Sequence, residues 1–110
     1  MGSATQPSMN EALDRLWKQF LPQIEERIAT LEAANKALSA GELSIDQRGA
    51  ANSAAHKLAG VLGTFGLTKG TILAREAEII YSGEQETDPA DAAQLTKIAE
   101  HLRALVNSRK

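Results

Sequence analysis

The chain has 110 residues, of which 43% are hydrophobic but only 4% are aromatic, and its formal net charge is −2. This length fits one domain, and a core of aliphatic and small side chains favours packed helices over a β-sandwich. The balanced charge argues against a nucleic-acid partner, the lack of cysteine excludes disulfides and thiolate chemistry, and no apolar run approaches the roughly 20 residues that span a bilayer.

The first residues show no features of a targeting segment. Met1-Gly2-Ser3 is not followed by a basic region and an apolar stretch, so no signal peptide is expected. We interpret residues 1–7 as a tag remnant or a disordered segment, and residues 8–110 as the domain. The absence of cysteine is compatible with a reducing compartment, and we expect a cytoplasmic protein without a membrane partner.

Two helical stretches are predicted in the first part of the chain. Ser8-Met9-Asn10-Glu11 has the pattern of a capping box, which begins a short first helix. Pro22 either ends this helix or begins a second one at its first turn, where its missing N–H is harmless. Gly41 is a natural stop for the second stretch. That stretch places four apolar residues on one stripe: Ile24, Ile28, Leu31 and Leu38.

Three more helices follow, and no segment alternates with the period of a strand. A second capping box, Ser44-Ile45-Asp46-Gln47, begins a helix that should run to about Phe65. The next helix is expected between Thr68 and Gly83, and Asp88-Pro89 supplies the cap and the first-turn proline of the last one. We therefore predict an all-α protein, an antiparallel four-helix bundle with an additional short N-terminal helix.

One face of the third predicted helix is unusual for a solvent-facing surface. At about 100° per residue, His56 lies opposite the apolar stripe. A solvent face usually carries long charged side chains, and a glycine inside a helix costs up to roughly 1 kcal/mol relative to alanine. We interpret Gly60 and Gly63 as leaving space for another protein, against the alternative of an ordinary surface histidine. The residues on the histidine's side are all small or short: Gly49, Asn52, Ser53, Ala59, Gly60 and Gly63.

An exposed imidazole in such a setting suits phosphoryl transfer. One ring nitrogen can attack phosphorus while an acceptor holds the other, and the transfer needs mainly positioning and charge stabilisation. A partner protein can supply the remaining groups. No glycine-rich phosphate loop follows a strand in this sequence, so we expect neither ATP binding nor an enzymatic activity of the chain's own.

Residues 54–67, AAHKLAGVLGTFGL, resemble the signature of histidine-containing phosphotransfer domains. In that family the phosphorylated histidine is followed two residues later by an aliphatic residue and four residues later by glycine, as His56 is by Leu58 and Gly60. Gly63 and Gly66 also match, and the GTFG segment is similar to the phosphotransfer module of chemotaxis-type histidine kinases. The resemblance implies a four-helix bundle that carries a phosphoryl group on His56.

The chain departs from this family at one position close to the histidine. The family commonly has a lysine three residues after the histidine, which helps to hold the phosphoryl group, and here that residue is Ala59. Lys57 lies roughly a quarter turn from His56 around the helix. The resemblance makes Lys57 a candidate phosphate stabiliser, unless the partner supplies this charge.

The resemblance also implies an orienting residue on the fourth helix. In chemotaxis-type modules a glutamate there accepts a hydrogen bond from the histidine Nδ1. Counting without a gap from the shared Thr-Phe-Gly places Glu78 at that position, with Glu76 as the weaker competitor. The alternative is a surface glutamate paired with Arg75 in its own helix.

The resemblance implies a phosphorelay intermediate with protein partners. A histidine kinase or the aspartyl phosphate of a response-regulator receiver would load His56, and a receiver would remove the phosphoryl group. The chain itself needs no cofactor, because the Mg²⁺ of such a transfer belongs to the receiver, and we expect a monomer. Two alternatives remain open. Ala59 favours a docking module that carries no phosphate, whereas a metal- or cofactor-binding bundle lacks the expected glutamate and Glu-x-x-His pattern.

Other polar and aromatic residues have simpler interpretations. His101 is expected at the surface near the end of the last helix, and Trp17 and Phe20 are expected to pack over one end of the bundle. Arg48 and Lys69 flank the third helix and could face an acidic receiver surface, although ordinary solvated charge is the default.

Overall fold

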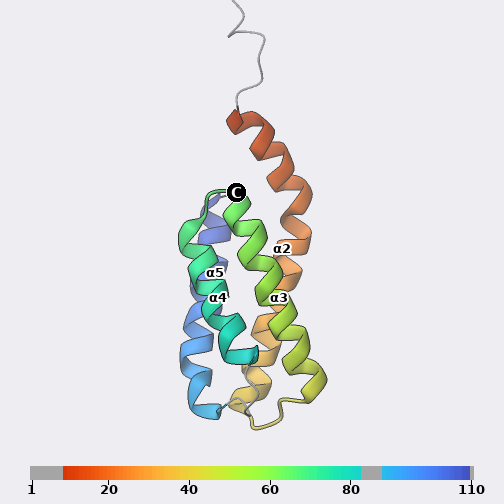
Figure 1. Ribbon diagram of the computed structural model, residues 1–110, viewed down its shortest axis with the longest axis vertical. Helices are drawn as coiled ribbons and strands as arrows, with labels where there is room; N and C mark the ends of the chain where they lie inside the picture. The colour runs from red at the N-terminus through yellow and green to blue at the C-terminus, as the bar shows by residue number, and fades with distance from the viewer. Residues whose placement is uncertain (1–8, 83–87, 110) are drawn as a thin grey trace, which may run out of the picture.

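The computed structural model describes residues 9–82 and 88–109, which form helices and no strand. Four α-helices run alternately up and down around one core (Figure 1). None of the described helices combines the length and the apolar character needed to cross a membrane. The predicted all-α antiparallel bundle is confirmed, whereas the predictions for residues 1–7 and for Gly83 lie outside the described residues. The elements are α2 (Met9–Ser39), α3 (Ile45–Thr64), α4 (Thr68–Ser82), the 3₁₀ helix η1 (Pro89–Asp91) and α5 (Ala92–Arg109).

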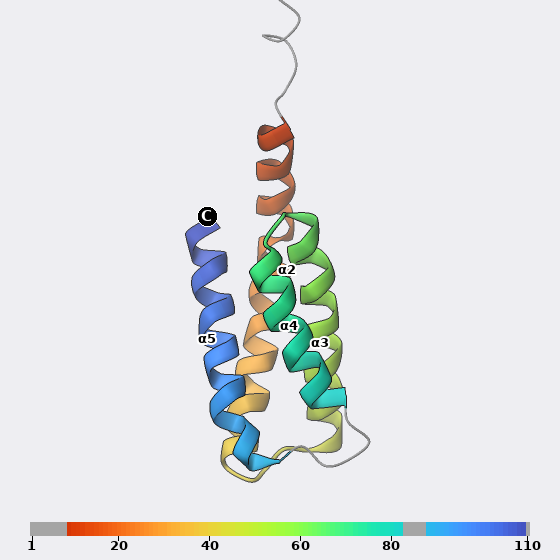
Figure 2. The same cartoon turned by 60° about the vertical axis from the view of Figure 1, so that its left-hand side comes forward.

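The first helix is longer than the sequence pattern predicts. Pro22 lies inside α2, so the structure corrects the prediction of an additional short N-terminal helix. A proline inside a helix lacks one hydrogen bond and crowds the preceding turn. Here Pro22 is exposed, while Trp17 and Ile24 on either side of it are buried in the same core, so packing on both sides keeps the helix continuous. The N-terminal turns of α2 extend beyond the other helices (Figure 2).

Two glycines end the first two helices in the same way. Gly41 and Gly66 have φ angles of 73° and 74°, a left-handed conformation that favours glycine. At the end of α2, Gly41 N donates to Leu38 O at 3.0 Å and Glu42 N donates to Ala37 O at 2.8 Å. This is the Schellman arrangement, and residues 66 and 67 repeat it at the end of α3.

Side chains that cap the first turn also begin α3 and η1. The Ser44 side chain accepts a hydrogen bond from Gln47 N at 3.0 Å, as the predicted capping box requires. Asp88 accepts from Ala90 N at 2.9 Å and caps η1, which leads directly into α5. The predicted helix starts at these two positions are therefore confirmed.

The core is mostly aliphatic, and a buried polar link crosses it near the end of the bundle where α2 and α4 end and α5 begins. The Tyr81 hydroxyl donates to Asn35 Oδ1, and Asn35 Nδ2 donates to Leu95 O at 3.0 Å. These bonds join α2, α4 and α5, and they satisfy polar groups that would otherwise be costly to bury. Besides Tyr81, the largest fully buried side chains of the core are Ile24, Ile28, Leu31, Leu58, Leu62, Leu95, Leu102 and Val106.

Small residues allow α3 and α4 to approach closely. A Cβ added to Gly70 of α4 would lie 3.0 Å from Leu62 Cδ1 of α3. Beside this contact, the Thr71 hydroxyl donates to Ala59 O at 3.0 Å. The side chains at the seam between these two helices therefore have little freedom to shift, and the seam lies beside His56.

Candidate functional site

His56 is an exposed polar residue on the outer face of α3. Its side chain is 74% exposed, because the opposite face of α3 is buried in the core through Leu58 and Leu62. The helix thus holds the imidazole at the surface on a rigid backbone. This is the position that the helical periodicity predicts.

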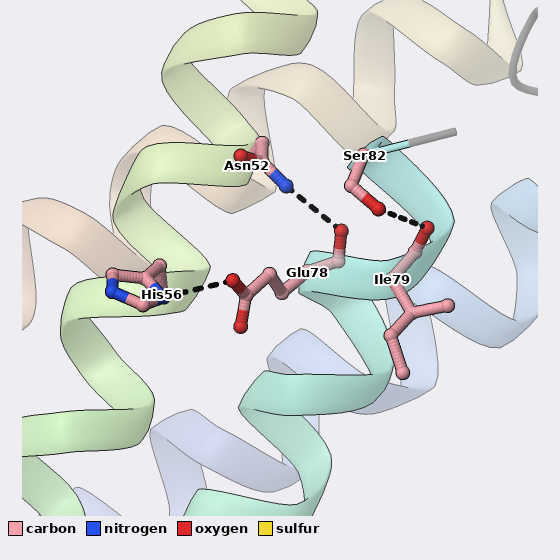
Figure 3. Close-up of polar contacts among 5 residues, drawn as sticks. All are labelled: Asn52, His56, Glu78, Ile79 and Ser82. Atoms are coloured by element: carbon pink, nitrogen blue, oxygen red, sulfur yellow. Dashed lines mark hydrogen bonds and ion pairs between the residues drawn. The ribbon is translucent and has the colours of Figure 1, made fainter. Parts of the chain in front are cut away.

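Glu78 of α4 holds one nitrogen of the His56 ring. The distance from His56 Nδ1 to Glu78 Oε2 is 2.8 Å (Figure 3). An ionised carboxylate can only accept a hydrogen bond, so this contact requires a proton on Nδ1. In the neutral ring, Nε2 then carries the free lone pair. Figure 3 shows Nε2 on the side of the ring that faces away from α4.

The structure shows which glutamate of α4 contacts His56, Glu78 or Glu76. It brings Glu78 to His56, as the family resemblance implies, and places Glu76 at an exposed position without a recorded contact to the ring. Within the described residues, the alternative ion pair between Glu78 and Arg75 is not formed. Glu78 is 27% exposed, so it is partly shielded by the seam between α3 and α4.

Asn52 also contacts Glu78, one helical turn before His56. Its Nδ2 donates to the main-chain oxygen of Glu78 at 2.9 Å (Figure 3). Asn52 is half-buried at the seam, so it does not simply line a partner surface. The sequence pattern placed Asn52 among the small residues near His56 but contained no signal for this bond between helices.

The small residues around His56 differ in what surrounds them. Gly60 and Ser53 are exposed, and a Cβ added to Gly60 would meet nothing within 4 Å. A Cβ added to Gly63 would lie 3.2 Å from Thr71 Oγ1, so Gly63 has a packing role in addition to its exposure. Gly60 is therefore the residue that most clearly leaves open space beside the histidine.

The structure corrects the prediction for Ala59. The sequence pattern predicts Ala59 on the exposed surface around His56, but this residue is only 4% exposed and belongs to the core. The helical angle alone placed it on the histidine's side, and the neighbouring helix α4 covers it there, with Thr71 bonded to its carbonyl. Ala59 does not contribute to a partner-binding surface.

Lys57 lies on the opposite side of His56 from Glu78. Together with Ser53 and Arg27, it lines a polar groove of about 430 Å³ between α2 and α3. Lys57 is exposed, and no contact between it and His56 is recorded. Lys57 therefore faces the α2 side of α3, whereas Glu78 approaches His56 from the α4 side.

The structure places the remaining polar candidates away from this site. His101 is half-buried on α5, and Lys69 is exposed at the start of α4. Trp17 packs edge-on against Phe65 with ring centroids 5.2 Å apart, as expected for a residue that covers one end of the bundle. Across residues 9–82 and 88–109, no three His, Asp or Glu side chains cluster as metal ligands.

Comparisons with known proteins agree with this geometry. The family model described as "Hpt domain" matches residues 15–107. The chain belongs to the Hpt-domain family. It is 32% identical over 91 residues to Protein RcaC of Microchaete diplosiphon, an alignment that covers 83% of this chain and 14% of RcaC. No solved structure matched.

Family membership gives this helical bundle a general role. Hpt domains carry out histidine phosphotransfer in two-component phosphorelays. The chain spans only a small part of the relative that it matches, so the activity of that whole protein is not transferred to it.

Proposed function

We propose that His56 accepts a phosphoryl group on Nε2 and passes it to, or receives it from, the aspartate of a response-regulator receiver. A histidine kinase is the other donor that fits. The observation that carries this proposal is the His56 ring itself: it is 74% exposed, and its Nδ1 is held 2.8 Å from a carboxylate. Such a ring has one nitrogen fixed as a donor and the other free as a nucleophile.

The proposed transfer moves one phosphoryl group between nitrogen and oxygen. The Nε2 lone pair attacks the phosphorus of the receiver's aspartyl phosphate, so that an N–P bond forms. The P–O bond to the aspartate breaks, and the carboxylate leaves with the electron pair. The proton on Nδ1 stays on the ring, where the Glu78 carboxylate stabilises the positive charge that develops on the imidazole. Transfer to a receiver is the reverse of these steps.

Two neighbours of His56 and the metal ion of the receiver have separate roles in this proposal. Lys57, exposed beside His56 on α3, supplies positive charge in place of the lysine that the family commonly has at the position of Ala59. Gly60 leaves room for the receiver to approach. The Mg²⁺ that neutralises the transferred group is held by the receiver's acidic residues, and the Hpt domain acts as a monomer that binds its partner transiently.

The alternative is a docking module that binds a receiver or a kinase without carrying phosphate. The absence of a lysine at position 59 is the observation that favours it. The transferring role is favoured because a module that only docks would not require a carboxylate on the Nδ1 of an exposed histidine.

Incubation with a phosphorylated receiver and Mg²⁺ tests the proposal. We expect an acid-labile, base-stable phosphate on the wild-type domain, none on His56→Gln, and normal labelling of His101→Gln as the matched control. Equal labelling of His56→Gln and the wild type would overturn the proposal. Binding of several receivers without labelling would support the docking module instead.

A further inference from the structure

Asn52 and His56 bind the same residue of α4 from consecutive turns of α3. Asn52 Nδ2 donates to the main-chain oxygen of Glu78 at 2.9 Å, and His56 Nδ1 contacts the carboxylate of Glu78 at 2.8 Å (Figure 3). From this geometry we propose that Asn52 is a positioning residue, which fixes the Glu78 backbone so that its carboxylate is aimed at His56. The inference rests on the proposed phosphoryl transfer at His56 and adds a residue to that site.

The location of Glu78 explains why it needs such support. α4 ends at Ser82, so Glu78 lies within about one turn of the helix end, where helices fray. A glutamate side chain also has several rotatable bonds, and it loses this freedom when it holds one partner. Anchoring the main chain of Glu78 removes the part of this motion that comes from the helix end.

Two hydrogen bonds between α3 and α4 flank the histidine along the seam. Asn52 bonds to Glu78 O on one side of His56, and Thr71 Oγ1 bonds to Ala59 O at 3.0 Å on the other. Both bonds run from a side chain of one helix to a carbonyl of the other, so they fix the relative register of the two helices. Of the two, only the Asn52 bond reaches the residue that holds the imidazole.

The choice of asparagine at this position is not explained by helix stability. Asparagine is a poorer helix former than alanine or leucine, and position 52 lies well inside α3. Its side chain is half-buried and directed at the carbonyl of another helix rather than at solvent. A donor of this reach is what the bond to Glu78 O requires, and apolar residues of similar size cannot supply it.

The test compares Asn52→Ala and Asn52→Leu with the wild-type domain. Asn107→Ala, an exposed asparagine of α5, is the matched control. Nitrogen-15 NMR of the His56 ring reports which nitrogen carries the proton, and the rate of labelling by a phosphorylated receiver reports function. In both Asn52 variants we expect a loss of the Nδ1–H tautomer and labelling that is slower by roughly threefold to tenfold, the effect of one hydrogen bond. Asn107→Ala should match the wild type.

The two variants separate positioning from packing. A change in Asn52→Ala that is absent in Asn52→Leu would assign the effect to lost packing and overturn the inference. An unchanged tautomer in both variants would also overturn it. Because the tautomer is read on the unphosphorylated domain, a wild-type protein that fails to accept phosphate would refute the proposed function while the role of Asn52 was still decided by NMR.

Discussion

The contact between His56 and Glu78 lies at the surface, where an ion pair or hydrogen bond adds little to stability. Exposed pairs of this kind are worth about 0–1 kcal/mol, and the His56 side chain is 74% exposed. The pair is therefore better understood through what it does to the imidazole than through folding. The carboxylate selects the ring nitrogen that carries the proton, and this choice determines which nitrogen can react.

Replacing the carboxylate of Glu78 by an amide tests this interpretation. A glutamine can donate as well as accept, so Glu78→Gln no longer selects a proton on Nδ1. We expect phosphoryl acceptance to slow by roughly threefold to tenfold, because the charge-assisted hydrogen bond between His56 Nδ1 and residue 78 is weakened. Glu76→Gln, two residues away on the same helix, should label at the wild-type rate. Equal rates in both variants would contradict the orienting role of Glu78.

The two glycines after the histidine should respond differently to alanine. A Cβ at Gly60 meets nothing, so Gly60→Ala should raise the free energy of unfolding by up to about 1 kcal/mol while it slows labelling by a receiver. A Cβ at Gly63 lies 3.2 Å from Thr71 Oγ1, so Gly63→Ala should gain less stability or lose some. Thermal unfolding and labelling rates measure both effects. A stabilised Gly60→Ala that accepts phosphate at the full rate would show that the open space has no role in docking.

At the scale of residues, the positions of site side chains are predictable where the periodicity of one helix or a shared motif determines them. The exposure of His56 follows from the periodicity of α3, and Glu78 follows from the motif that the family shares. Ala59 was misplaced because a helical angle does not say where the neighbouring helix lies, and α4 covers that edge of α3. The bond from Asn52 to Glu78 depends on the register between two helices, which no local pattern encodes.

At the scale of single elements, α2 is held together across a proline. Pro22 is exposed, but Trp17 and Ile24 on either side of it are buried in one core. A proline inside a helix costs up to about 3 kcal/mol relative to alanine, through one missing hydrogen bond and crowding of the preceding turn. The packing of α2 offsets this cost.

Restoring that hydrogen bond should stabilise the domain without touching the site. We expect Pro22→Ala to raise the free energy of unfolding by about 1–3 kcal/mol in a denaturant titration, with the rate of phosphate acceptance unchanged. Gln23→Ala, the exposed neighbour, should change stability only slightly. A Pro22→Ala variant that is no more stable than the wild type would indicate that the helix does not strain around the proline.

The boundaries of the other helices were predictable because their signals are local. Ser44 and Asp88 cap the helical segments that follow them, and Gly41 ends α2 through its positive φ angle. The continuity of α2 was not predictable in the same way. Proline is compatible with both a break and a first turn, and only tertiary packing decides between these and a continuous helix.

At the scale of the whole molecule, three helices meet at the buried hydrogen bonds of Tyr81. Its side chain is 1% exposed, and its hydroxyl donates to Asn35 of α2, which in turn donates to Leu95 O of α5. Apolar periodicity predicts that residues are buried but not that polar groups find each other across the core. This link was therefore absent from the sequence-based description of the bundle.

Burial gives Tyr81 a measurable effect on stability at high pH. Desolvation raises the pKa of Tyr81 from 10.0 to about 12. As the pH rises, the unfolded chain loses the phenolic proton of Tyr81 before the folded protein does. Tyr81 should therefore leave the free energy of unfolding unchanged below pH 10 and lower it between pH 10 and pH 12. The loss is about 3 kcal/mol at roughly 1.4 kcal/mol per pKa unit. The chain has one tyrosine, so its absorbance titration reports this group alone.

A phenylalanine at this position provides the control for the pH effect. Tyr81→Phe should lack this part of the alkaline loss, although it leaves Asn35 Oδ1 without its donor and costs about 1–3 kcal/mol at neutral pH. Chemical unfolding of both proteins across the alkaline range makes the comparison. Parallel curves for the wild type and the variant would contradict the assigned burial of the hydroxyl.

The position of the phosphoryl group on the ring tests the central claim most directly. Phosphorus-31 and nitrogen-15 NMR of the domain, phosphorylated by a receiver, identify both the residue and the nitrogen that carry the phosphate. The geometry of His56 and Glu78 predicts an N–P bond at Nε2 of His56, with the proton retained on Nδ1. Phosphate on Nδ1, on another residue such as His101, or on no residue after exposure to competent receivers would contradict it.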